Sequence, residues 1–112
     1  MNNRTPSLTE VDRLIHEPSR SIILAVLDAV KTADFLYLQR ETGLTKGNLT
    51  IHLSKLEKAG YIKIQKTYRG KVPLTLCEIT IQGREAFKAY RRQLKQFIED
   101  TNEPRNPLDV EM

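Results

Sequence analysis

The stretch that most constrains the fold runs from Thr45 to Gly60 and has the spacing and end signals of one amphipathic helix. A Thr hydroxyl can accept from the free amides of a first helical turn, and Gly can adopt the left-handed conformation that closes a helix. Leucines recur within the stretch at intervals of four and three, so they form one stripe that must be buried. These leucines are Leu49, Leu53 and Leu56.

The other side of this helix is polar and basic. Its residues are Gly47, Ile51, Ser54 and Lys58 opposite the leucines, Asn48, Thr50 and Lys55 on the flanks, and Lys46 in the first turn. Such a face can simply be a solvated helix surface, so its meaning depends on the segments around it.

Positive charge is concentrated on this helix and the segment after it. The whole chain carries a net charge of +4. From Lys46 to Lys71 there are seven basic residues and one acid, Glu57, a balance of 7 − 1 = +6, so the remainder carries 4 − 6 = −2. A basic surface of this kind is expected of a protein that faces a phosphate backbone.

Length and composition indicate one globular domain. The chain has 112 residues, 39% of them hydrophobic and 29% charged, which is ordinary for such a domain. No apolar run reaches the roughly 18 residues that span a bilayer, and the first residues lack the apolar core of a signal peptide. The single cysteine, Cys77, cannot form an internal disulfide. We therefore expect a cytoplasmic protein that does not enter a membrane.

Two helices are predicted near the N-terminus. Residues 1–7 are polar and should form a flexible arm. The first helix is expected over 8–15, with Ser7 and Glu10 as a capping box. The second is expected over 18–30, where a proline suits the first turn. Its wide apolar face consists of Ile22, Ile23, Val26, Leu27 and Val30.

A third helix is predicted over 35–42, after a short connection over 31–33, with Asp34 as its cap and Gly43 at its end. Only two residues then separate this helix from Thr45. Two helices joined by a tight turn that contains Gly have the sequence shape of a helix-turn-helix, in which the second helix enters a DNA groove. Helical hairpins also occur in structural proteins, so the following segment matters.

The following segment predicts a β-hairpin with a basic tip. Residues 61–67 alternate between apolar and polar, and 74–79 can return as a second strand. Arg69 and Lys71 lie in the turn between them. Together with the preceding helices, a basic hairpin over 67–74 predicts a winged helix-turn-helix, a mainly α fold with a small β-hairpin (α+β).

The last predicted helix covers 81–100, is capped by Thr80, and completes a domain over 8–100. Its apolar seam can be buried on its own domain or in a subunit interface. A small winged domain has little core surface left to cover so long a helix, which favours the interface. The tail over 101–112 contains two prolines and several acids and is expected to be disordered. The seam consists of Phe87, Tyr90, Leu94, Phe97 and Ile98.

Three motifs together resemble the small stand-alone winged-helix transcriptional regulators of bacteria and archaea, relatives of the ArsR-like and MarR-like repressors. They are GLTKGNLTIHLSKLEKAGYI across the amphipathic helix from Thr45 to Gly60, RGKVPLT across the hairpin and ITIQGREAF at the start of the last helix. The match extends from about His16 to Phe97. The resemblance implies a homodimer, joined through terminal helices, that binds a pseudo-palindromic operator. It departs from the metal-sensing branch, which has a CxC-type cysteine pair before the turn, and Cys77 stands where an aromatic residue is common.

Within the recognition helix, 45–59, and the wing, we divide the side chains by expected contact. Asn48, Thr50 and Ile51 should face base edges, Asn48 through hydrogen bonds and Ile51 through a thymine methyl. Phosphate contacts are expected from Thr45, Lys46, His52, Ser54, Lys55, Tyr68, Arg69 and Lys71. The expected dimer interface comprises Leu8, Val11, Phe87, Tyr90, Leu94, Phe97 and Ile98.

Several residues have a second interpretation. His52 lies at the edge of the leucine stripe and can be either a packed structural residue or a phosphate contact. Cys77 should face inward, which favours a small buried hydrophobe over a redox switch. Two histidines and one cysteine do not make a zinc site, and no cofactor is expected. No phosphate loop, paired catalytic carboxylates or Ser/His/Asp arrangement is visible in the sequence, so we do not expect an enzyme.

A different function class stays open, since a winged helix can also serve as a protein-interaction or RNA-binding module. RNA recognition usually uses exposed aromatic residues, for which Tyr61 and Tyr68 are the candidates. The basic helix face and the basic wing favour double-stranded DNA instead. The sequence leaves open whether any small-molecule effector binds.

Overall fold

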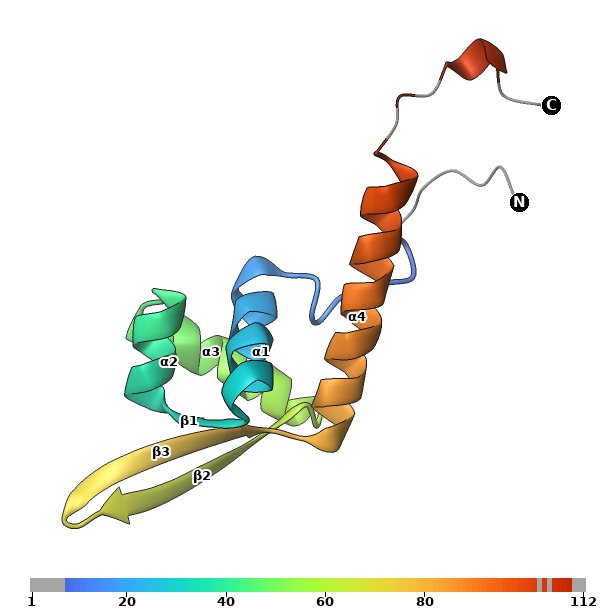
Figure 1. The fold of residues 1–112 in the computed structure, drawn as a ribbon. Helices are drawn as coiled ribbons and strands as arrows, with labels where there is room; N and C mark the ends of the chain where they lie inside the picture. The colour runs from blue at the N-terminus through green and yellow to red at the C-terminus, as the bar shows by residue number, and fades with distance from the viewer. Residues whose placement is uncertain (1–7, 103, 105, 110–112) are drawn as a thin grey trace.

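The computed structural model describes residues 8–102, 104 and 106–109, so the arm predicted over 1–7 and the Ser7 cap lie outside the described residues. Figure 1 shows the helices within residues 18–58 packed together, with the long β-hairpin of residues 62–79 along one side and the helix of residues 81–100 beside them. In chain order the elements are α1 (Pro18–Val30), β1 (Thr32–Asp34), α2 (Phe35–Thr42), α3 (Lys46–Lys58), β2 (Ile62–Arg69), β3 (Val72–Ile79), α4 (Ile81–Asp100) and a short 3₁₀ turn, η1 (Pro107–Asp109).

The strands form one antiparallel sheet in the order β1-β3-β2. Strands β2 and β3 pair along their whole length, from Ile62 opposite Ile79 to Arg69 opposite Val72. Gly70 has a φ of +64° at the tip, a conformation that costs Gly little. The hairpin therefore reaches past α2 and α3 as a wing, and the winged-helix fold is confirmed (Figure 1).

The predicted helix ends are confirmed by their caps. Thr45 accepts from the Asn48 amide at 3.2 Å at the start of α3, and Asp34 accepts from the Tyr37 amide at 2.8 Å at the start of α2. Gly43 ends α2 with a φ of +72°. These local hydrogen bonds satisfy amides that have no partner inside the helix.

One core joins all the helices to the sheet. Leu49, Leu53 and Leu56 of α3 are buried in it, as the leucine spacing predicted. Helix α4 packs closely against the backbone of Tyr61 at Gly83. A Cβ added at Gly83 would lie only 2.0 Å from the Tyr61 carbonyl oxygen, so this approach requires glycine. The remaining core residues are Val11, Ile15, Ile23, Leu24, Leu27, Ala33, Leu38, Ile62, Cys77, Ile79, Phe87 and Tyr90.

The prediction of a helix over 8–15 is wrong, because these residues form turns. The Asp12 side chain accepts from the amides of Leu14 at 2.9 Å and Ile15 at 3.2 Å. A carboxylate that binds nearby amides offers the backbone an alternative to helix, and here it stabilises a run of turns. The apolar residues that suggested a helix still serve the core, since Val11 and Ile15 are buried.

Three smaller expectations need correction. The connection predicted over 31–33 contains strand β1, whose Ala33 pairs with Cys77 of β3. On α1, Ile22 and Val30 are 40% and 41% exposed, because the buried stripe is centred on Leu24 instead. In the described part of the tail, residues 107–109 form a 3₁₀ turn.

Candidate nucleic-acid interface

Helix α3 exposes the side that the sequence predicted. Ile51 is 54% exposed although it is apolar, and Asn48, Thr50 and Lys55 are also exposed. The helix is capped at its start and held by three buried leucines, so this face is presented rigidly.

The exposed side of α3 has two different flanks. One flank, with Lys46, Thr50 and Ser54, lines a groove against the wing, whose own wall includes Lys66 and Pro73. The other flank carries His52, which is half-buried beside α1. Ile51 lies between the two flanks by its position on the helical wheel. The three residues predicted to meet bases therefore span the strip between the wing and α1.

Two hydroxyls in this face are already used within the helix. Thr45 accepts from the Asn48 amide at 3.2 Å. Thr50 donates to the Lys46 carbonyl oxygen at 2.9 Å. In this arrangement the Thr50 side chain has its methyl group and an accepting oxygen free for an external partner, while its proton is engaged.

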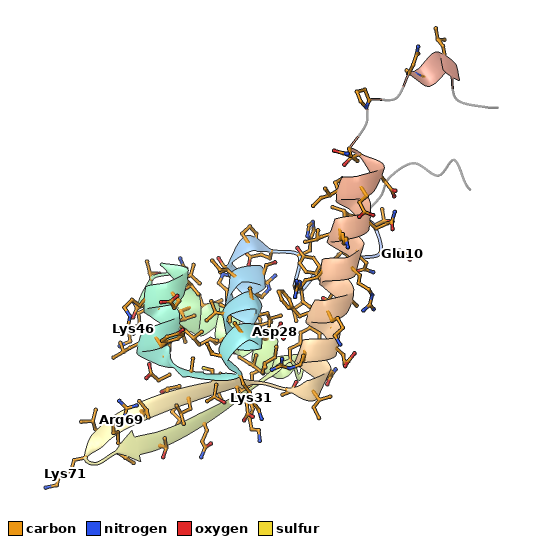
Figure 2. The ribbon with its side chains drawn as sticks, viewed as in Figure 1. Glu10, Asp28, Lys31, Lys46, Arg69 and Lys71 are labelled. Atoms are coloured by element: carbon orange, nitrogen blue, oxygen red, sulfur yellow. The ribbon has the colours of Figure 1, made fainter. Side chains whose placement is uncertain are left out.

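The wing carries its basic residues at the tip. Lys71 and Tyr68 are exposed there, and the Arg69 guanidinium lies 4.0 Å from the Asp34 carboxylate. Figure 2 shows Lys46, Arg69 and Lys71 at the end of the molecule that is remote from α4. Asp34 could not be recognised from the sequence as a partner for Arg69, because the two residues meet only through the sheet.

His52 makes a contact that sequence reasoning missed. Arg20 of α1 has its Nη1 at 3.0 Å from His52 Nδ1, and Glu17 Oε1 lies 3.8 Å from the same nitrogen. The basic character of Arg20 was visible in the sequence, but no local pattern connects α1 with α3.

The residues predicted for a dimer interface fall into three groups. Val11 and Phe87 are each 7% exposed and Tyr90 is 6% exposed, so these three already belong to the core of their own chain. Leu8 and Leu94 pack partly against that core. Phe97 is half-buried, and Ile98 is 63% exposed near the end of α4. Figure 1 shows this end of α4 standing clear of the other helices.

The fully buried Cys77 and the partly buried Tyr61 have raised pKa values. Burial, the hydrogen bond to Asp12 and that carboxylate's charge together raise the pKa of Tyr61 to about 12. Burial, with smaller contributions from the carboxylates of Glu57 and Asp34, raises the pKa of the Cys77 thiol to about 11. A thiol with so high a pKa is mostly protonated at neutral pH, and therefore Cys77 suits a structural role.

Among the described residues, no group of three or more His, Cys, Asp or Glu side chains could hold a metal ion. Within the same part of the chain, no helix is long and apolar enough to cross a membrane.

The arrangement defines a class of protein. A helix-turn-helix whose second helix exposes polar side chains beside a basic β-hairpin is a winged helix of the nucleic-acid-binding kind. The winged helix DNA-binding domain family matches residues 20–98. The chain belongs to this family.

Similar proteins agree with this assignment. An uncharacterized protein of Methanocaldococcus jannaschii is 38% identical over 86 residues, which are 76% of this chain and 92% of that protein. The structure of a transcriptional regulator homologue from Pyrococcus horikoshii OT3 is 31% identical and has a TM-score of 0.75, covering 88% of this chain and 91% of that one. The structure of NadR in complex with 4-hydroxyphenylacetate shares the fold, with 19% identity and a TM-score of 0.62, over 78% of this chain and 64% of that one. The resemblance to small winged-helix transcriptional regulators is thereby confirmed.

Proposed function

We propose that this protein is a sequence-specific regulator that binds double-stranded DNA as a homodimer on a pseudo-palindromic operator. Residues 45–59 enter the major groove, and the wing over 67–74 lies on the backbone or in the adjacent minor groove. The observation that carries the proposal is the exposed strip of Asn48, Thr50 and Ile51 on a helix that is otherwise fixed in the core.

The base-reading residues differ in what they can recognise. Asn48 has an exposed amide side chain that can pair with an adenine edge, and Ile51 suits a thymine methyl. The Thr50 proton is engaged by the Lys46 carbonyl, so this residue would accept a hydrogen bond or contact a methyl group. A mismatch at a contacted base pair should cost about 1–3 kcal/mol.

The phosphate-binding residues lie around that strip. Lys46 and Ser54 are on the wing side of α3, His52 and Lys55 are on the α1 side, and Thr45 is at the helix start. Tyr68, Arg69 and Lys71 extend the basic surface along the wing (Figure 2). Contacts of this kind fix the position of the protein on DNA without reading sequence.

The dimer is supported by the free end of α4. Ile98 is largely exposed, Phe97 is half-buried, and both follow Leu94 along one apolar stripe. Burial of that stripe against the same stripe of a second copy would remove it from water and give the two-fold symmetry of a palindromic site. Phe87 and Tyr90 would support this interface from within their own core rather than form its surface.

Selection of bound sites from a random duplex library tests the proposal directly. We expect an enriched sequence with two-fold symmetry and half-sites about one helical turn apart. In a salt titration of the selected duplex, Lys71→Gln should reduce the slope of log affinity against log salt by about 0.9, since one phosphate contact is lost. Glu85→Gln, on the exposed side of α4, is a matched control that should leave the slope unchanged.

The same experiments separate the alternative functions. A protein-interaction module would enrich no duplex sequence, even at low salt. An RNA-binding module would prefer single-stranded RNA over the duplex and would lose affinity when Tyr68 is replaced, because stacking on an aromatic side chain dominates such binding.

A further inference from the structure

The His52 side chain is held by a residue outside the helix-turn-helix. Arg20 of α1 lies 3.0 Å from His52 Nδ1 through its Nη1 atom, and its Nε donates to the Leu14 carbonyl oxygen at 2.5 Å. The Arg20 side chain is 12% exposed and that of His52 is 17% exposed. The guanidinium is therefore fixed between the turn before α1 and the recognition helix.

The chemistry of this contact determines where the imidazole carries its proton. A guanidinium has only donors, so a hydrogen bond from Arg20 requires a lone pair on Nδ1. The proton of the neutral ring then lies on Nε2. Glu17 Oε1 is 3.8 Å from Nδ1, beyond hydrogen-bond range, and it accepts from the Arg20 amide at 2.8 Å. Glu17 thus offers no close acceptor that would favour a proton on Nδ1.

Within the part of the chain that the structure describes, Nε2 of His52 has no hydrogen-bond partner, so its N–H group is available to an external one. Among the described residues the His52 ring hydrogen-bonds through Nδ1, and no buried side-chain nitrogen or oxygen lacks a partner. His52 lies one turn after Asn48 and one turn before Lys55, both of which are exposed. Its free donor thus belongs to the flank of α3 that lies away from the wing.

We propose that Arg20 is a positioning residue for DNA binding, which holds the His52 ring so that its Nε2–H donates to a phosphate oxygen on the α1 side of the recognition helix. This inference rests on the proposed function. Arg20 acts through His52 and, being mostly buried, neutralises no phosphate itself. The contact at His52 is an uncharged donor, in contrast to the lysines around it.

Two substitutions of His52 separate its two nitrogens. His52→Asn keeps an oxygen that can accept from Arg20 but has no donor at the position of Nε2, whereas His52→Gln places an amide nitrogen near that position. We expect His52→Asn to bind the selected duplex about tenfold or more weakly, the loss typical of a hydrogen bond to a charged group. His52→Gln should retain more of the affinity.

The salt dependence distinguishes an uncharged donor from a cation. The slope of log affinity against log salt should be unchanged in His52→Asn, because no charge is removed. Lys55→Gln is the matched control on the same flank and should reduce the slope by about 0.9. A similar reduction in His52→Asn would overturn the inference, since it would identify a charged imidazolium on the phosphate.

The role of Arg20 is tested by a double-mutant cycle. Arg20→Met should weaken binding in the wild-type background and have little further effect in His52→Asn. Equal losses in both backgrounds, or no loss in a folded Arg20→Met protein, would overturn the inference while leaving the proposed function intact. Failure of the wild-type protein to bind any duplex would overturn both.

A direct readout on the wild-type protein does not depend on how well the variants fold. Nitrogen NMR shifts of the His52 ring in the free wild-type protein should show the tautomer with the proton on Nε2. In a folded Arg20→Met protein the share of the Nδ1–H tautomer should rise, because the donor to Nδ1 is gone. A proton found on Nδ1 in the wild-type protein would contradict the inference whatever the affinities are.

Discussion

The Tyr61 hydroxyl donates a hydrogen bond to Asp12 Oδ2, which ties the turns before α1 to the residue that precedes β2. The other oxygen of that carboxylate accepts from the amides of Leu14 and Ile15. Tyr61 also accepts from the Thr80 amide through its carbonyl oxygen at 3.0 Å. One tyrosine thus joins the N-terminal turns, the sheet and the start of α4.

Tyr61→Phe should lower the free energy of unfolding by about 1–3 kcal/mol at neutral pH, because Asp12 Oδ2 loses its donor. The folded-state pKa of Tyr61 is about 12, above the value of about 10 for an unfolded chain. Its contribution is therefore complete below pH 10 and is lost as pH rises from about 10 to about 12.

Urea unfolding at pH 7, 9 and 11 measures this dependence. The Cys77 thiol titrates in an overlapping range, so both proteins should carry Cys77→Ala. The difference between Tyr61 and Phe at this position should shrink at pH 11, while Tyr68→Phe on the exposed wing should show no such change. A constant difference across this range would argue against the role of the Asp12 hydrogen bond.

Gly83→Ala and Gly47→Ala should have opposite effects on stability. At Gly83 an added Cβ would lie 2.0 Å from the Tyr61 carbonyl oxygen, and relief of that overlap should cost about 3 kcal/mol. At Gly47 a Cβ meets nothing within 4 Å, and replacing Gly within a helix should stabilise by about 0.5 kcal/mol. Denaturant unfolding of the two variants checks both signs, and a tolerated Ala at position 83 would refute the close approach of α4 to the sheet.

The Cys77 thiol should resist modification in the folded protein. Its side chain is fully buried and its pKa is raised to about 11, so little thiolate is present and access is blocked. At pH 8 a disulfide reagent should react with Cys77 only as fast as the protein opens, and mild denaturant should accelerate the reaction. Rapid labelling of the native protein would instead indicate a reactive, regulatory cysteine.

Ile98→Glu should convert the proposed dimer to monomers. A charge at this exposed apolar position opposes burial against a second copy. The core of each protomer should be unaffected, because Ile98 is 63% exposed within its own chain. Arg92→Glu, also exposed on α4, makes a larger change in charge on the side of the helix away from the apolar stripe and should leave the dimer intact. Sedimentation of both variants gives the answer, and a dimeric Ile98→Glu protein would exclude this interface.

The elements that the sequence predicted correctly are those with local signals. Helix α3 has a cap at Thr45 and a leucine stripe, and α4 was located by Thr80 and its apolar spacing. The wing followed from alternation on both sides of a basic turn that contains Gly70. The caps are hydrogen bonds within three residues, and the hairpin joins two segments that follow each other directly in the chain, so a single sequence suffices to find them.

The features that the sequence did not predict depend on contacts between residues far apart in the chain. The apolar spacing over 8–15 suggested a helix, but the Asp12 carboxylate binds nearby amides and Tyr61, which lies far along the chain. The hydrogen bond between Arg20 and His52 joins two helices, and no periodic pattern in the sequence predicts it. Phe87, which was expected at a subunit interface, is 7% exposed within its own chain, and no local pattern predicts how α4 lies relative to α1.

The central claim is that the exposed strip of α3 reads DNA bases, and Ile51→Ala tests it most directly. Wild-type and Ile51→Ala proteins should be compared in one selection from random duplex DNA, with thermal unfolding as the check on folding. We predict that the wild-type protein selects a two-fold symmetric site with a thymine preferred at one position of each half-site, and that the variant loses this preference alone. An unchanged site preference in a folded Ile51→Ala protein, or no enriched site for the wild-type protein, would contradict the claim.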